Sequence, residues 1–242
     1  MKNRWLVCPQ PNSSATVRLF LFPYAGGAPS SFNKWASEFP NHIEVNTVHY
    51  PGRGSRYNEP LIKELSVLVE EIKNAIQTEL DKPFFFFGHS MGAVLAFEIA
   101  CRINPQPQIL FVSACGAPHV SNPNRPIHAL SDPEFIKSLQ ELNGLPAEVS
   151  NNTELMELLL PTLRADFEAI ENYQYTSNEH QLKCPIIAFG GIEDTHVSSQ
   201  HLEAWSKLTS SSFKSQYFSG DHFFINAARQ SLIASMISEI RS

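Results

Sequence analysis

The 242-residue sequence carries only a modest net charge and has no long hydrophobic run. It contains 18 lysines and arginines against 24 aspartates and glutamates, a net charge of −6 with a pI near 5.8. This balance argues against a nucleic-acid-binding protein, because such proteins carry a basic surface. No stretch approaches the ~18 apolar residues of a membrane span. Pro9 and Pro11 interrupt the region where a signal peptide needs its apolar segment. We therefore expect a cytoplasmic protein that binds neither nucleic acid nor membrane.

Cysteine is also scarce, and no two of the four cysteines have the spacing of a zinc-binding or redox motif. Scattered single cysteines without an export signal are typical of reduced thiols. No cysteine and histidine cluster has the spacing of metal ligands. The sequence therefore predicts no disulfide, no bound metal and no organic cofactor. The cysteines are Cys8, Cys101, Cys115 and Cys184.

What the sequence does contain is an alternation of short apolar runs with longer helical patterns. Residues 19–22 and 84–87 are apolar at every position, as in a central strand of a parallel sheet with helices on both faces. Residues 61–76, 91–103 and 223–240 have helical patterns. The alternation predicts an α/β fold with a mostly parallel central sheet flanked by helices. We expect a single domain over residues 1–242. The runs expected to form strands are residues 17–23, 43–50, 83–87, 109–114, 185–189 and 214–218.

One segment, residues 118–181, interrupts this alternation. It shows two or three helical patterns and no convincing strand, and Ser131 followed by Pro133 is typical of a helix start. In α/β folds, a segment inserted between two strands can cover the carboxyl ends of the strands, where ligands bind. We expect residues 118–181 to form a helical lid insertion, with ordinary packing as the alternative.

The sharpest motif is Gly-His-Ser-Met-Gly at residues 88–92, which fits the pattern G-x-S-x-G. It follows a predicted strand and opens a predicted helix, as a nucleophile elbow must. In such a turn the serine is exposed above the sheet, and the N–H of the next residue is free to stabilise an oxyanion. We therefore expect Ser90 to be a nucleophile and the amide of Met91 to be an oxyanion donor.

A serine hydroxyl needs a base to accept its proton. In α/β-hydrolases the serine precedes the acid and the acid precedes the histidine. His222 follows the last predicted strand, where the base belongs, whereas the rival His196 precedes that strand. Asp194 follows the strand at residues 185–189 and is the expected acid, with Glu193 as the neighbour most easily confused with it. Capping of the next helix is the alternative role for either carboxylate.

A second oxyanion donor is expected from the loop after an early strand. Residues 22–27, with the sequence Phe-Pro-Tyr-Ala-Gly-Gly, occupy that place, and their glycines allow a close approach to a substrate oxygen. We expect the amide of Ala25 to be this donor, with Tyr24 as the alternative.

Together, five segments resemble the type II thioesterases, the free-standing α/β-hydrolases that accompany nonribosomal peptide and polyketide synthases. The resemblance spans nearly the whole chain. The segments Tyr-Pro-Gly-Arg-Gly-Ser-Arg and Leu-Arg-Ala-Asp-Phe are the most specific, because generic hydrolases lack them. The five segments are residues 22–27, 50–56, 88–92, 163–167 and 220–224.

The resemblance implies hydrolysis of acyl thioesters on the phosphopantetheine arm of an acyl or peptidyl carrier protein. It implies that Ser90 is the nucleophile, His222 the base and Asp194 the acid that orients it. It also implies that the insertion shapes the acyl channel, that the carrier protein and small acyl substrates are the partners, and that the substrate itself carries the phosphopantetheine. We expect a monomer.

Three other interpretations remain open at this point. A generic carboxylesterase or lipase would share the triad but not the two specific segments. A catalytically idle scaffold would not require all three triad positions to be filled. A cyclising domain cut from a synthase is a nearer relative. In addition, Arg53, Arg56 and Arg164 are candidates for contacts with phosphate or an acidic carrier, or for structural salt bridges.

Overall fold

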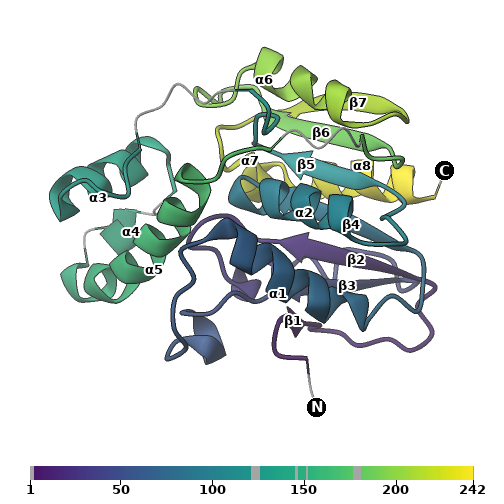
Figure 1. The fold of residues 1–242 in the computed structure, drawn as a ribbon, viewed down its shortest axis with the longest axis horizontal. Coiled ribbons are helices and arrows are strands. Elements are labelled where there is room, and N and C mark those ends of the chain that lie inside the picture. The colour runs from purple at the N-terminus through teal and green to yellow at the C-terminus, as the bar shows by residue number, and fades with distance from the viewer. Residues whose placement is uncertain (1–2, 121–125, 145–146, 151, 177–180, 242) are drawn as a thin grey trace.

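The computed structural model describes residues 3–120, 126–144, 147–150, 152–176 and 181–241, and a seven-stranded sheet forms its centre (Figure 1). The strand order is β1-β3-β2-β4-β5-β6-β7, and all neighbours are parallel except β1, which runs antiparallel to β3. The prediction of an α/β fold with a mostly parallel sheet is confirmed. The strands are β1 (Leu6–Val7), β2 (Val17–Phe22), β3 (Ile43–Val48), β4 (Phe84–His89), β5 (Leu110–Ser113), β6 (Ile186–Gly191) and β7 (Phe213–Phe218).

Helices cover both faces of the sheet (Figure 1). This agrees with the central strands, whose side chains are apolar on both faces. One face packs against α1 (Leu65–Gln77), α2 (Met91–Arg102), α6 (Ser199–Glu203) and the 3₁₀ helix η3 (Ala204–Leu208). The other face packs against the 3₁₀ helix η1 (Pro29–Phe32) and the helices α7 (Phe224–Ala227) and α8 (Arg229–Ile240). A further 3₁₀ turn, η2 (Gly54–Arg56), follows β3.

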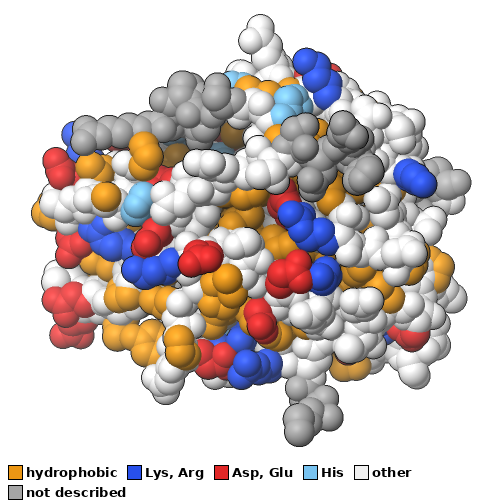
Figure 2. Space-filling model, in the orientation of Figure 1, with side chains coloured by type: hydrophobic (Ala, Val, Ile, Leu, Met, Phe, Trp, Pro, Cys, Tyr) orange, Lys and Arg blue, Asp and Glu red, His pale blue; other side chains and the backbone are white. Residues whose placement is uncertain are grey.

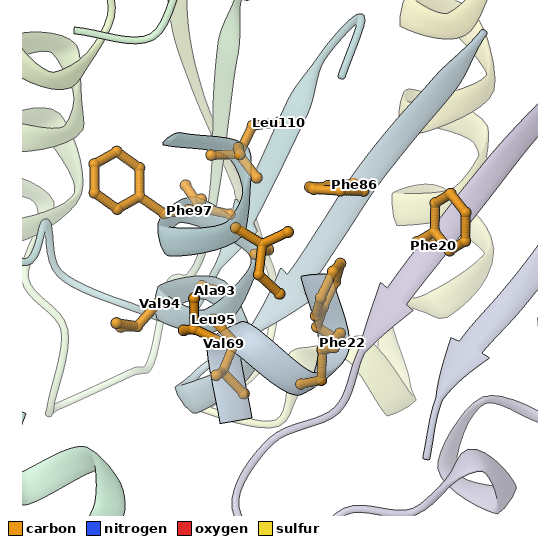
Figure 3. Close-up of a cluster of buried hydrophobic side chains, with 14 of the residues drawn as sticks. Phe20, Phe22, Val69, Phe86, Ala93, Val94, Leu95, Phe97 and Leu110 are labelled. Atoms are coloured by element: carbon orange, nitrogen blue, oxygen red, sulfur yellow. The ribbon is translucent and has the colours of Figure 1, made fainter. Parts of the chain in front are cut away.

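Alternate residues of each central strand enter different cores. Phe20 and Phe86 point toward α2 and meet edge to face, with their ring centroids 5.8 Å apart (Figure 3). Leu19 and Phe87, on the same two strands, face α8 and η1. Leu110 of β5 belongs to the α2 side and is fully buried. Burial on both faces holds the strand ends in fixed positions, and the loops after β2 and β4 start from there.

The strand order brings two of the candidate segments together. β2 lies between β3 and β4, with Phe22 opposite Gly88, so the loops that follow β2 and β4 leave the sheet side by side. The connection from β2 turns toward β3, whereas the chain after β4 proceeds toward β5. Ligands of open parallel sheets bind at such a switch point, beyond the carboxyl ends of the strands.

Between β5 and β6 the chain forms the helices α3 (Asp132–Glu141), α4 (Ala147–Ser150) and α5 (Thr153–Glu171), which lie beside the carboxyl ends of the strands (Figure 1). Ser131 begins α3 as predicted, with its amide and hydroxyl both donating to the Glu134 carboxylate. The predicted insertion also includes residues 121–125, 145–146, 151 and 177–180, which lie outside the described part of the chain.

Helix α5 contains Pro161, and most of its buried residues follow the proline. Lys63 pairs with Glu168 at 3.0 Å between Nζ and Oε2. The Glu171 carboxylate accepts hydrogen bonds from the amides of Ile127 and His128. A proline lacks the N–H of a helical hydrogen bond, so the helix is weakest at this point.

The structure differs from the sequence prediction at β1 and at the C-terminal helix. The two-residue strand β1 was not predicted, because Leu6 and Val7 are too few to form a periodic pattern. The helix predicted over residues 223–240 is divided into α7 and α8 at Ala228. The Ala228 amide donates to the Phe224 carbonyl, and its own carbonyl accepts from the Leu232 amide, so the two helices share this residue. The apolar spacing of the sequence runs through the break and does not reveal it.

The four cysteines are free, as expected from the sequence. Burial raises the pKa of the Cys101 and Cys115 thiols to about 12, so both are protonated and unreactive at neutral pH. No helix among the described residues is long and apolar enough to cross a membrane.

Charged side chains of both signs lie beside one another on the face shown in Figure 2. Surface ion pairs include Lys73 with Glu70 and Lys214 with Glu239. Each such pair contributes little to stability, because water and salt screen it. The fold therefore depends mainly on the two apolar cores.

These cores lead to a matched test of stability. We expect Leu110→Ala to lower the free energy of unfolding by about 2–5 kcal/mol, because it leaves a cavity in a closely packed core. Leu158→Ala, the same change at a position 52% exposed on α5, should change it by less than about 0.5 kcal/mol. Urea unfolding followed by circular dichroism measures both, and equal losses would show that the core is placed wrongly.

Candidate active site

Ser90 lies in a tight turn between β4 and α2, with φ 53° and ψ −121°. A non-glycine residue rarely adopts this conformation, and such strain is typical of a nucleophile elbow. Two glycines make the turn possible. A Cβ on Gly88 would lie 2.2 Å from the Gly92 carbonyl oxygen, and a Cβ on Gly92 would lie 2.0 Å from the Phe22 oxygen. A side chain at Gly88 would push α2 away from β4, and one at Gly92 would push it away from the end of β2.

A chain of hydrogen bonds joins Ser90, His222 and Asp194. His222 Nε2 lies 3.2 Å from Ser90 Oγ, and His222 Nδ1 lies 2.9 Å from Asp194 Oδ2. The side chains of His222 and Asp194 are 10% and 1% exposed, respectively, so water competes little for these contacts. The three residues come from the loops after β4, β6 and β7, which meet at the carboxyl edge of the sheet.

The surroundings of Asp194 keep it ionised. Burial alone would raise the pKa of this carboxyl, but the hydrogen bond and charge of His222 oppose burial and the net shift is downward. The amides of His196 and Val197 also donate to Asp194 Oδ1, at 2.8 and 3.2 Å. Asp194 thus holds its own loop and contacts His222 at the same time. The next helix, α6, is capped by Ser198 and not by Asp194. An ionised Asp194 can accept a hydrogen bond from the N–H at His222 Nδ1, which leaves Nε2 unprotonated and able to accept the serine proton.

The rival residues have other partners. Glu193 accepts the amide of Gly220. Asp221 accepts the amide of Phe223 at 2.8 Å and the side-chain amide of Asn143 at 2.9 Å. The ring of His196 lies 6.3 Å from the ring of His222, centroid to centroid. Geometry therefore brings the side chains of Ser90, His222 and Asp194 together. The side chains of Glu193, Asp221 and His196 stay outside this hydrogen-bonded chain.

His89, the last residue of β4, supports the turn at Ser90 through its side-chain contacts. Its Nδ1 lies 2.9 Å from Ser113 Oγ, and its ring contacts those of Tyr24, His222 and Phe223. Burial, together with the nearby His222, places the pKa of His89 well below its usual value. His89 is therefore neutral and adds no positive charge beneath the base.

The loop after β2, residues 23–27, has two amides that are already used. The Gly26 N–H donates to Asp166 Oδ2 at 2.7 Å, and the Gly27 N–H donates to the Tyr24 carbonyl at 2.8 Å. Within the described part of the chain, the amides of Tyr24 and Ala25 have no hydrogen-bond partner, and neither does that of Met91 at the start of α2. The choice of Ala25 over Tyr24 stays a prediction.

The sequence did not reveal the role of Asp166, which lies in the segment at residues 163–167 of the predicted insertion. Arg53 and Asp166 form a two-pronged ion pair, with Nη1–Oδ2 at 2.6 Å and Nη2–Oδ1 at 2.8 Å. Arg56 pairs with Glu59, so it too has a partner within the protein. The signal in the sequence was the presence of opposite charges in the two most specific segments, residues 50–56 and 163–167.

Arg164 belongs to the insertion itself. Its guanidinium donates to the His128 carbonyl and to Asp132 Oδ1, each at 2.5 Å, and lies over the ring of Phe135. Structural contacts thus account for all three arginines that the sequence left open. In the described residues, no group of three or more His, Cys, Asp or Glu side chains is placed to hold a metal ion.

The arrangement of the site is suited to acyl transfer, and it distinguishes the two neighbouring carboxylates. In Asp194→Asn the side-chain amide no longer fixes the His222 tautomer, so we expect turnover of a p-nitrophenyl ester to fall by about 10⁴-fold. Glu193→Gln changes only the contact to Gly220, and its turnover should stay close to that of the parent protein. Circular dichroism checks that both variants fold. A greater loss of turnover in Glu193→Gln than in Asp194→Asn would show that Glu193, and not Asp194, is the acid.

Comparison with known proteins agrees with this site. The model of the thioesterase domain family matches residues 17–240. Gramicidin S biosynthesis protein GrsT of Aneurinibacillus migulanus is 42% identical over 243 residues, covering 99% of this chain and 94% of that protein. Linear gramicidin dehydrogenase LgrE of Brevibacillus parabrevis is also 42% identical, over 247 residues with the same coverage. The solved structure of the type II thioesterase BorB from the borrelidin biosynthetic cluster matches with a TM-score of 0.90 at 31% identity, over 97% of this chain and 96% of that one.

The name of LgrE describes an oxidoreduction, whereas the family model and the name of BorB describe a thioesterase. The parallel sheet flanked by helices and the likeness to BorB confirm the α/β-hydrolase fold. The resemblance to type II thioesterases inferred from the sequence is also confirmed. This chain belongs to the thioesterase domain family and is a serine hydrolase that acts on thioesters.

Proposed function

We propose that this protein is a type II thioesterase that removes acyl groups from the phosphopantetheine arm of carrier proteins, clearing misprimed or stalled modules of a nonribosomal peptide or polyketide synthase. The observation that carries the proposal is the hydrogen-bonded chain from Ser90 through His222 to Asp194 in a member of this family. The names of two relatives support the synthase assignment, since one refers to gramicidin S biosynthesis and the other to the borrelidin biosynthetic cluster.

In the first half-reaction, His222 Nε2 accepts the Ser90 hydroxyl proton as Oγ attacks the thioester carbonyl. The carbonyl oxygen becomes an oxyanion that accepts hydrogen bonds from the amides of Met91 and Ala25. The intermediate then collapses and the carbon–sulfur bond breaks. His222 returns the proton to the leaving pantetheine sulfur, and the acyl group remains as an ester on Ser90.

In the second half-reaction, water takes the place of the serine. His222 Nε2 accepts a proton from the water, whose oxygen attacks the acyl ester, and the same amides hold the oxyanion. Collapse breaks the bond to Ser90 Oγ, which recovers its proton from His222. A free carboxylic acid leaves. Throughout both steps the proton on His222 Nδ1 stays on the ring, and Asp194 accepts its hydrogen bond and balances the imidazolium charge.

The insertion serves as the lid of this site and shapes the acyl channel. Two contacts support this role. A Cβ on Gly26 would lie 2.4 Å from Leu163 Cδ2, so α5 lies directly on the loop after β2. In addition, the side-chain amide of Asn143, which follows α3, donates to Asp221, the residue before His222. The cytoplasmic location, the monomeric state and the single domain over residues 1–242 stay predictions from the sequence.

A direct test compares an acetyl group on a phosphopantetheinylated carrier protein with p-nitrophenyl acetate. We expect a clear preference for the carrier-bound thioester. Ser90→Ala and His222→Ala should each lower turnover of both substrates, by a factor on the order of 10⁶ for the serine.

Either of two results would contradict the proposal. Rapid ester cleavage without any gain from the carrier would indicate a generic carboxylesterase. Undiminished thioester hydrolysis by folded Ser90→Ala would exclude the proposed nucleophile.

A further inference from the structure

The loop after β2 is held in place by side chains from outside it. Tyr50 Oη donates to the Pro23 carbonyl at 3.0 Å, and Asp166 Oδ2 accepts the Gly26 amide at 2.7 Å. Arg53 Nη1 donates to the Gly27 carbonyl at 3.1 Å. These contacts lie on both sides of Ala25, whose amide has no hydrogen-bond partner in the described part of the chain.

The contacts fix the two peptide planes that flank the Ala25 α-carbon. The Tyr24 carbonyl and the Ala25 N–H belong to one trans peptide and point in opposite directions. Since the Gly27 amide donates to the Tyr24 carbonyl, the Ala25 N–H must point away from Gly27. The next plane contains the Gly26 N–H, which Asp166 accepts. Gly26 has φ +77°. Because glycine can adopt many other backbone conformations, Gly26 would populate several of them if the contact with Asp166 were lost.

Asp166 is itself fixed by a closed network. Its carboxylate accepts two bonds from Arg53, whose side chain is 7% exposed, while that of Asp166 is 2% exposed. Arg53 Nε also donates to the Pro51 carbonyl at 3.1 Å. A charge-assisted, two-pronged pair is the most directional ionic contact in proteins. Because both partners are buried, the carboxylate has few other positions available to it.

We propose that Asp166, oriented by Arg53, is a positioning residue that fixes the loop after β2 so that the Ala25 amide points at the oxyanion. Asp166 touches no reacting atom; it acts through the Gly26 amide. Because Asp166 belongs to α5, the helical insertion completes the oxyanion site as well as covering it. This inference rests on the proposed function for the identity of the oxyanion, but it holds for an ester as well as a thioester.

The test uses the full chain and three substitutions. Asp166→Ala removes the acceptor of the Gly26 amide, and Asp166→Asn keeps the shape but loses the charge that orders Arg53. Glu168→Gln is the matched control, because it lies two residues further along α5, pairs with Lys63 and does not contact the loop. If Asp166→Ala does not fold, Asp166→Asn and the doubly substituted Arg53→Gln/Asp166→Asn, which leaves no unpaired buried charge, carry the test.

Turnover is measured with p-nitrophenyl acetate, so that the result is independent of any preference for a carrier. The number of active sites is counted by complete labelling of Ser90 with a fluorophosphonate. For the Asp166 variants we expect kcat per labelled site to fall at least about tenfold, toward the 10²–10³-fold loss typical of one missing oxyanion donor. KM should stay within about threefold, because the ground-state ester makes little use of the oxyanion contacts.

A second readout separates positioning from a purely structural role. A trifluoromethyl ketone adds Ser90 Oγ to its carbonyl and forms a tetrahedral oxyanion, so its inhibition constant should rise by the same factor as kcat/KM falls. Misfolding would instead lower the labelled fraction and leave kcat per labelled site unchanged. Parent-like kcat and inhibition constant in a folded Asp166→Ala or Asp166→Asn protein would overturn the inference, as would an equal loss in Glu168→Gln. Loss of the carrier preference alone would count against the proposed function and not against this inference.

Discussion

The first turn of α2 lies against the end of β2 so closely that no side chain fits between them, and the rest of the site depends on this approach. Gly92 provides it, since any Cβ there would meet the Phe22 carbonyl. The contact puts the start of α2 beside the loop after β2, so the amides of Met91 and Ala25 belong to neighbouring loops that follow different strands. The positive φ of Ser90 is maintained because β4 and α2 are both fixed in the core, and their positions restrict the backbone of the turn between them to this conformation.

Much of the fold was predictable because strand and helix patterns are local. The run at residues 84–87 is buried on both faces, as its uniform apolarity indicates. The Ser131 helix start also follows from short-range chemistry. The break at Ala228 was not predictable, since it depends on two hydrogen bonds that apolar spacing does not record.

The same distinction applies to the site. The chain order of α/β-hydrolases placed Ser90, Asp194 and His222 in loops that the structure brings within hydrogen-bonding distance. The role of Asp166 could not be predicted from chain order, because its partners Arg53 and Gly26 are 113 and 140 positions away in the chain. Only the sheet order and the return of α5 over the strands bring those three residues together. A charged side chain that is buried needs a partner, but the sequence alone does not identify that partner.

Pro161 gives α5 two halves with different freedom to evolve. The half after the proline carries Asp166, Glu168 and Glu171, and each of these is bound to another part of the protein. The half before it carries the exposed Leu158 as well as the buried Met156. Substitutions at exposed positions of the first half, such as Leu158, leave the contacts of Asp166 with Arg53 and Gly26 intact. Sequence divergence in α5 should therefore be concentrated at the exposed positions before Pro161, where the cost to folding is smallest.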